Sequence, residues 1–130
     1  GAGTIARGAS VEALNGPQEF LGERAAVFRQ RRDLVVDRLN MCAGLTCRRP
    51  EGAFYVFASC AGTIGKKTPG GDTLETDLDF AAYLLDEAQV AVVPGTAFGL
   101  SPYFRVSYAT ATEALEEACD RIEAACAKLV

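Results

Sequence analysis

The chain has 130 residues, of which 49% are hydrophobic and 23% are charged, and its formal net charge is −4 at pH 7. A chain of this size and composition suits one globular domain with a single hydrophobic core. The negative charge argues against a nucleic acid as the main partner, because nucleic-acid binding favours a basic face. No apolar run approaches the roughly 18 residues that a membrane span requires, so we expect no membrane partner either.

The N-terminal part of the sequence predicts one long helix. Residues 10–14 indicate the end of an earlier helix that Asn15 and Gly16 stop, and Pro17 suits the first turn of the next helix. We expect the long helix to run from 17 to about 41 and to link two bodies. Its apolar residues repeat at intervals of seven and form one stripe: Phe20, Leu21, Val27, Phe28, Leu34 and Val35.

The rest of the chain predicts short strands and two further helices. The strand candidates are 45–49, 53–57, 90–93 and 103–109. Segment 61–72 is rich in Gly, Thr, Lys and Pro, so we expect a mobile loop there. Strands mixed with helices, without strict alternation, indicate a two-layer α+β domain. We expect a short mixed or antiparallel sheet that helices cover and that the long linking helix precedes.

The two later helices carry start signals and apolar faces. Capping-box spacing joins Thr76 to Asp79 and Thr110 to Glu113, and it predicts a helix start at each threonine. The apolar residues of the middle helix are Phe80, Leu84, Leu85 and Ala88. Those of the last helix are Leu115, Ala118, Cys119, Ile122, Cys126 and Leu129, which share one face at helical spacing.

The five cysteines indicate reduced, mostly buried thiols. Their number is odd and no CxxC occurs. Cys119 and Cys126 lie about 10 Å apart along one predicted helix, which is too far for a disulfide. The chain has no histidine, which argues against a zinc site, and we expect no metal. Reduced thiols favour a cytoplasmic location.

Groups suited to catalysis are scarce. Without histidine the commonest general base is absent. A Schiff-base lysine must be held and desolvated, yet Lys66 and Lys67 lie in the predicted loop and Lys128 lies near the end of the chain. Cys60 has no basic partner nearby in sequence. We therefore expect no catalytic residue in this chain.

Arg105 is the one residue whose placement predicts a binding role. A guanidinium in the middle of an apolar strand is costly unless an anion pairs with it. Strand alternation places Tyr103, Arg105 and Ser107 on one face of the sheet. The planar fork of arginine suits a carboxylate held by two parallel hydrogen bonds. From the residues alone, an internal salt bridge to a nearby Asp or Glu, or a strand that faces solvent on that side, is the favoured explanation of Arg105.

Three segments, taken in order, resemble the C-terminal part of class I aminotransferases. They are 51–57 (EGAFYVF), 90–95 (VAVVPG) with Phe98 and Gly99, and 104–109 (FRVSYA) followed by an acidic amphipathic helix. Segments 11–18 and 31–34 are similar to the part that leads into that domain. Segment 60–66 with Thr68 and Pro69 is similar to bacterial aspartate aminotransferases in particular. Each motif is weak alone, but their ordered combination covers almost the whole chain.

The resemblance implies a role for Arg105 and for the domain. In this family a large domain binds pyridoxal phosphate through a lysine Schiff base, and the small domain closes over bound substrate. The arginine of the family's FR-[IV]-S motif holds the substrate α-carboxylate, and that role falls on Arg105. The lysine and the other cofactor-binding residues belong to a domain that this chain lacks. No cofactor-binding residue is therefore carried over to this chain.

The resemblance also divides the chain and predicts its activity. Residues 1–16 are expected to lead in from the cofactor domain, and 17–130 to form the C-terminal small domain. The whole protein is expected to be a cytoplasmic homodimer. It would transfer an amino group between an amino acid, aspartate or glutamate first, and a 2-oxo acid by ping-pong chemistry. The alternative is a free-standing α+β module that binds a small amino acid through Arg105 without catalysis.

Overall fold

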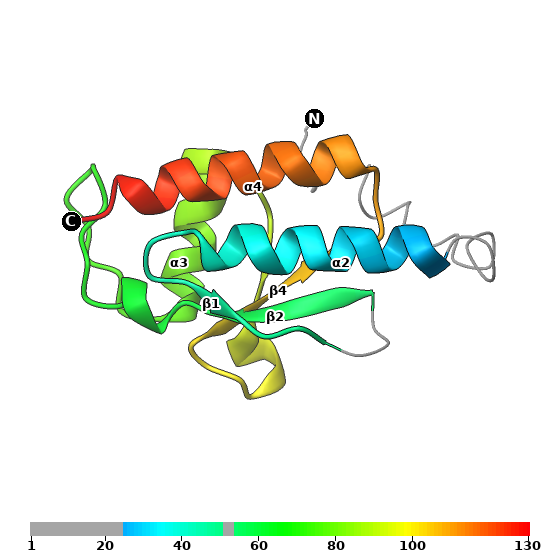
Figure 1. Ribbon diagram of the computed structural model, residues 1–130. Coiled ribbons are helices and arrows are strands. Elements are labelled where there is room, and N and C mark those ends of the chain that lie inside the picture. Colours follow the sequence, from blue (N-terminus) through cyan, green and yellow to red (C-terminus); the bar gives the residue numbers. More distant parts are fainter. Residues whose placement is uncertain (1–24, 51–53) are drawn as a thin grey trace.

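An antiparallel sheet with helices on one face forms the part of the chain that the structure, a computed structural model, describes: residues 25–50 and 54–130 (Figure 1). The strands are β1 (Thr46–Cys47), β2 (Tyr55–Ser59), β3 (Val93–Pro94) and β4 (Tyr103–Ser107), in the order β1-β2-β4-β3. Every neighbouring pair is antiparallel. The predicted α+β class with a short antiparallel sheet is therefore confirmed.

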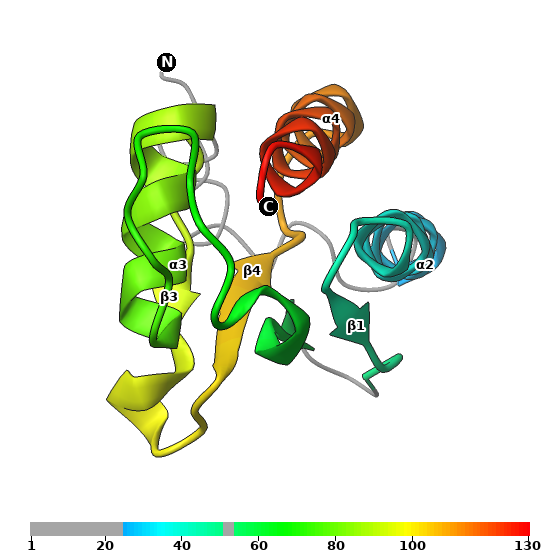
Figure 2. The same cartoon turned by 90° about the vertical axis from the view of Figure 1, so that its left-hand side faces the viewer.

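The helices lie above one face of the sheet. The main ones are α2 (Ala25–Asn40), α3 (Asp77–Tyr83) with its continuation η4 (Leu84–Ala88), and α4 (Thr112–Ala127). Helices α2 and α3 contact the strands, and α4 packs on α2 and η4 (Figure 2). Strand side chains alternate between buried and exposed in β2 and β4. The sheet consequently has one face in the core and one open face.

The long N-terminal helix is confirmed within the described residues as α2. Its expected first turns, 17–24, lie outside them, as does the expected lead-in segment 1–16. Phe28 and Val35 of the predicted stripe are buried, together with Val36 and Leu39. At the end of the helix the Asn40 side chain bonds the backbone of β1 twice: Nδ2 donates to the Cys47 carbonyl oxygen at 2.8 Å, and Oδ1 accepts from the Cys47 amide at 2.8 Å. These bonds join the C-terminal end of α2 to β1.

Strand β3 differs most from its prediction. The sequence predicts a strand at 90–93. The observed strand comprises only Val93 and Pro94, while Val90 is fully buried without strand pairing. Proline lacks an amide donor and is tolerated in an edge strand, and β3 is the last strand of the sheet.

One capping prediction is confirmed and the other is wrong. The Thr76 side chain accepts a hydrogen bond from the Asp79 amide at 3.2 Å and caps α3. The second capping residue is Ala111, not Thr110, and no side chain caps α4. Ala111 is extended, with φ −62° and ψ 144°, so the helix begins at Thr112. Thr112 Oγ1 instead accepts a hydrogen bond from Arg31 of α2 at 3.2 Å.

The segment expected to be a mobile loop, 61–72, carries regular structure. It begins with the short helix η3 (Ala61–Thr63), and Lys67 pairs with Thr73 in a β-bridge. Two hydrogen bonds join the backbone of Lys67 to that of Val130, at 2.8 and 3.1 Å. This segment therefore packs beside the C-terminus, and its sequence composition is a poor guide to its structure.

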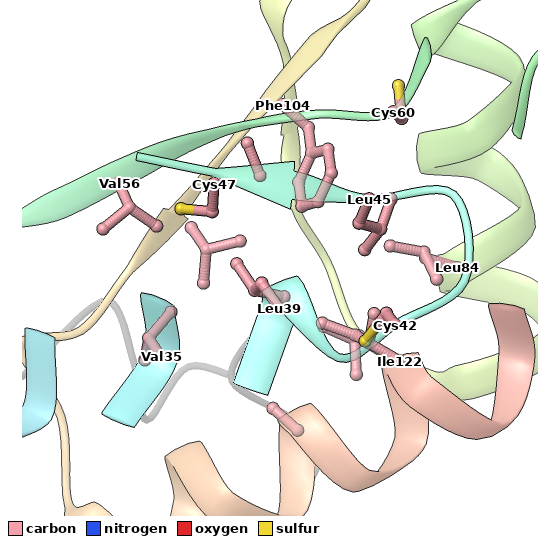
Figure 3. Packing of buried hydrophobic residues seen from close by; sticks show 14 of the residues in the cluster. Val35, Leu39, Cys42, Leu45, Cys47, Val56, Cys60, Leu84, Phe104 and Ile122 are labelled. Carbon is pink, nitrogen blue, oxygen red and sulfur yellow. The ribbon is translucent and has the colours of Figure 1, made fainter. Parts of the chain in front are cut away.

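The predicted apolar faces of the later helices form much of the core. All six residues expected on the face of the last helix are buried. Phe80, Leu84 and Ala88 of the middle helix are buried too, whereas Leu85 is exposed, contrary to its expected place on the apolar face. Figure 3 shows that Cys42, Cys47 and Cys60 lie among these apolar side chains. The five cysteines are free and buried, as predicted.

Candidate functional site

Arg105 lies at the centre of the sheet. It pairs with Phe57 of β2 on one side and with Val93 of β3 on the other. Its neighbours Phe104 and Val106 are buried under the helices, while Arg105 is half-buried and belongs to the open face. The predicted alternation along this strand is therefore confirmed, and Arg105 is the charged residue of β4 on that face.

Two aromatic rings flank the guanidinium of Arg105. Its carbon Cζ lies 4.5 Å from the ring centroid of Tyr55 and 4.8 Å from that of Phe98. The ring of Phe57 stands nearly perpendicular to both, with centroids 5.9 Å from Tyr55 and 5.8 Å from Phe98. Aromatic faces attract a guanidinium and leave its N–H groups free at the edges. The arrangement fixes the position of the cation without neutralising it.

No acidic side chain of 25–50 or 54–130 pairs with Arg105. Every ion pair in these ranges joins other residues, and no hydrogen bond joins the Arg105 side chain to another described residue. Within 25–50 and 54–130, the internal salt bridge that the sequence left open is therefore not formed. Tyr55 and Phe98, whose rings flank the guanidinium, are 36% and 44% exposed, and Tyr103, on the same face of β4 as Arg105, is 38% exposed. An apolar rim around a cation that has no ion pair within the described ranges suits the capture of an anion that carries apolar atoms.

A groove of about 370 Å³ continues this face toward β1. Its lining residues are Thr46, Arg48, Arg49, Pro50, Tyr55, Phe57 and Tyr103. Arg105 does not line the groove, but Tyr55, Phe57 and Tyr103 connect the two. Arg49 is bound to Asp33 of α2, at 2.9 Å. The open face thus combines aromatic walls with positive charge at its centre and at its margin.

The segment that carries Phe98 is tightly folded. It comprises the short helix η5 (Gly95–Phe98) and the turn that leads into β4. A Cβ atom on Gly95 would lie 2.0 Å from the Leu100 carbonyl oxygen and 2.6 Å from that of Tyr103. Only glycine fits such a close approach of backbone to backbone. The motif that contains Phe98 and Gly99 indicated the family resemblance, but nothing in it predicted that the Phe98 ring lies beside Arg105.

The other candidate groups lie away from this chemistry. Burial raises the pKa of the Cys60 thiol to about 12, so Cys60 is not a reactive thiolate at neutral pH. Lys128 pairs with Glu87 at 2.6 Å, and Lys67 lies beside the C-terminus. Among the residues that the structure describes, no three metal-ligating side chains gather, and no helix is long and apolar enough to cross a membrane.

Comparison with known proteins identifies the family. The model for aminotransferase class I and II matches residues 3–122. The chain belongs to the class I and II aminotransferase family. It is 62% identical to an aspartate aminotransferase of Rhizobium meliloti strain 1021 over 97% of its own length. It is 57% identical to an aspartate/prephenate aminotransferase of Cereibacter sphaeroides, also over 97% of its own length. It spans 31% and 32% of the lengths of these two aminotransferases.

The fold agrees with the same family. A crystal structure of the aspartate aminotransferase from Rhizobium meliloti superimposes with a TM-score of 0.83 and 63% identity. The match covers 93% of this chain and 30% of that aminotransferase. The resemblance that the sequence motifs indicated is therefore confirmed. The role of Arg105 within this aminotransferase domain stays a prediction.

Proposed function

We propose that this chain is the C-terminal small domain of an aminotransferase that moves an amino group between an amino acid and a 2-oxo acid. Aspartate or glutamate is the favoured amino acid, because the relatives described above are named aspartate or aspartate/prephenate aminotransferases. In this proposal the whole protein is a cytoplasmic homodimer.

The observation that carries the proposal is the guanidinium of Arg105, which lies between two aromatic rings and has no ion pair among the residues that the structure describes. An amino acid offers a carboxylate whose two oxygens match the fork of the guanidinium. The rings limit rotation of the guanidinium, so less freedom is lost when the carboxylate binds. In this proposal Arg105 binds the α-carboxylate and orients the substrate.

The aromatic rings around Arg105 also exclude water from the bound carboxylate. Tyr55, Phe57 and Phe98 surround the cation with apolar surface, which keeps water away once a ligand covers the face. An ion pair shielded from water is stronger than one in bulk solvent. Closure of the domain over substrate would complete this shielding. The domain therefore contributes binding, orientation and exclusion of water.

The cofactor of this proposal is pyridoxal phosphate, which supplies the electron-sink chemistry of amino-group transfer when bound. The described residues do not fit a site for its covalent attachment. Lys128 is exposed and paired with Glu87, and Lys66 and Lys67 belong to the segment beside the C-terminus. We accordingly assign the cofactor to residues outside this chain.

The test is an assay of the protein expressed from its full reading frame, with pyridoxal phosphate added. We expect 2-oxo acid to form from aspartate when a second 2-oxo acid is supplied as acceptor. No transfer from aspartate, glutamate or prephenate-derived amino acids would contradict the proposal. A reading frame that encodes no lysine-bearing cofactor domain would favour the amino-acid-binding module instead.

A further inference from the structure

A buried carboxylate holds the segment that carries Phe98. Asp77, the first residue of α3, is fully buried, although it is charged and lies at the start of a helix. One of its oxygens, Oδ2, accepts a hydrogen bond from the Thr96 amide at 2.7 Å. The other, Oδ1, accepts from the hydroxyl groups of Thr96 and Ser101, each at 2.7 Å. Both oxygens of Asp77 are thus used by one segment.

The bonds of Asp77 serve this segment rather than the helix. Thr76 already caps α3, because its side chain accepts from the Asp79 amide. A buried carboxylate is costly unless hydrogen bonds compensate for lost solvation. Burial tends to raise the pKa of Asp77, but the bonds from Thr96 and Ser101 outweigh it, and the pKa lies below its ordinary value. The carboxylate is therefore ionised and fully engaged at neutral pH.

The two anchored residues bracket Phe98. Thr96 precedes it within η5 and Ser101 follows it in the turn before β4. The Leu100 amide donates to the Gly95 carbonyl oxygen at 2.8 Å and closes the segment on itself. Asp77 therefore holds this segment on both sides of Phe98, through Thr96 and Ser101. The ring centroid of Phe98 lies 4.8 Å from Cζ of Arg105.

We propose that Asp77 is a positioning residue for substrate binding: it anchors Thr96 and Ser101, and thereby keeps the Phe98 ring against the guanidinium of Arg105. The inference rests on the proposed role of Arg105 in binding a substrate carboxylate. Without Asp77, the segment between Gly95 and Tyr103 loses the hydrogen bonds that hold Thr96 and Ser101. The Phe98 ring then moves away from the guanidinium of Arg105, and the guanidinium adopts orientations that do not match a carboxylate.

The experiment uses the full-length protein with its cofactor and compares Asp77→Asn with Asp79→Asn. Both substitutions remove one negative charge from the first turn of α3. Asp79 is exposed, its Oδ2 accepts from the Glu75 amide at 2.9 Å, and among the described residues its side chain makes no hydrogen bond to η5. We measure KM for aspartate, kcat, cofactor absorbance and the dissociation constant of succinate, an unreactive dicarboxylate.

We expect Asp77→Asn to raise KM and the dissociation constant of succinate roughly 5- to 30-fold, while Asp79→Asn changes neither by more than about twofold. Ser101→Ala and Thr96→Val each remove part of the anchor and are expected to weaken succinate binding to a smaller degree. These milder variants decide the question if Asp77→Asn does not fold. Unchanged succinate binding in all of the folded anchor variants would overturn the inference.

A double variant separates positioning from general stability. If Asp77 acts through Phe98, Asp77→Asn adds little to the loss in succinate binding that Phe98→Ala already causes. Fully additive losses would overturn the inference. If instead the proposed role of Arg105 is wrong, Arg105→Ala leaves KM for aspartate and succinate binding unchanged, which distinguishes that outcome from a failure of the role of Asp77. An effect of Arg105→Ala without any effect of the anchor variants refutes the role of Asp77 alone.

Discussion

The guanidinium carbon of Arg105 lies 4.5 Å from the ring centroid of Tyr55, on the strand that pairs with its own. The two residues are not opposite each other in the register: Tyr55 pairs with Ser107, and Arg105 pairs with Phe57. The contact is therefore diagonal across the sheet, within reach of a long side chain. It joins the central cation to the aromatic wall of the groove.

This diagonal contact predicts different effects for two substitutions of Tyr55. Tyr55→Phe keeps the ring and should retain nearly normal KM. Tyr55→Ala removes one of the two faces that hold the guanidinium, and KM for aspartate should rise about 3- to 30-fold, as expected from the strength of a cation–π contact. Steady-state kinetics of the full-length variants tests this. Equal KM values for the two variants would show that the ring does not hold Arg105.

Gly95 should tolerate no side chain. A Cβ there would lie 2.0 Å from the Leu100 carbonyl oxygen, so Gly95→Ala forces the backbone apart. We expect a loss of about 3 kcal/mol or more in the free energy of unfolding, or failure to fold. Gly70→Ala is the control, since its Cβ would meet only Thr68 Oγ1, at 3.8 Å. Similar melting temperatures for both variants would contradict the close approach at Gly95.

Asp77 should contribute a pH-dependent part of the stability. Its pKa in the folded protein lies below the ordinary value of 3.8, because hydrogen bonds from Thr96 and Ser101 outweigh the effect of burial. Its contribution is therefore present above the unfolded pKa and is lost as the pH falls through the folded value. The melting temperature of the wild type should exceed that of Asp77→Asn from about pH 7 to pH 5, and the difference should shrink below about pH 4. A difference that grows on acidification would contradict this assignment.

The buried thiols should react slowly while the protein is folded. Burial raises the pKa of Cys47 to about 11 and that of Cys119 to about 12. At about pH 8 we expect iodoacetamide to label Cys47 and Cys119, which are buried and free, about 100-fold more slowly than in denaturant. Mass analysis of peptides after timed labelling measures each site. Rapid labelling of either of them in the native protein would show that it is accessible.

Much of the fold was predictable because it depends on local periodicity. Alternation along 103–109 placed Arg105 and the buried Phe104 on opposite faces of the sheet. Helical spacing likewise identified the buried face of α4. The second capping prediction failed because Thr110 is buried and Ala111 is extended, so the chain has not yet turned into the helix. Such a start depends on how the preceding strand joins the core, which spacing does not reveal.

The site was predictable only in its central residue. A charge in an apolar strand is unusual in any context, so Arg105 is visible in the sequence. The ring of Tyr55 reaches it through the register of β2 against β4, and the ring of Phe98 through the tight turn after η5. In the sequence Asp77 is one of several acidic residues near a helix start, and only the fold brings Thr96 and Ser101 within hydrogen-bond distance of it. These relations are tertiary, and no motif in a single sequence encodes them.

The central claim is that Arg105 binds the carboxylate of an amino-acid substrate, and kinetics of Arg105→Ala and Arg105→Lys in the full-length protein test it most directly. Removal of the guanidinium leaves the carboxylate unpaired, so kcat/KM for aspartate should fall roughly 30-fold or more in Arg105→Ala. Arg105→Lys keeps the charge but loses the fork, and we expect an intermediate loss. The absorbance of the bound cofactor should stay normal in both variants. Nearly unchanged kcat/KM in Arg105→Ala, with that absorbance intact, would contradict the account.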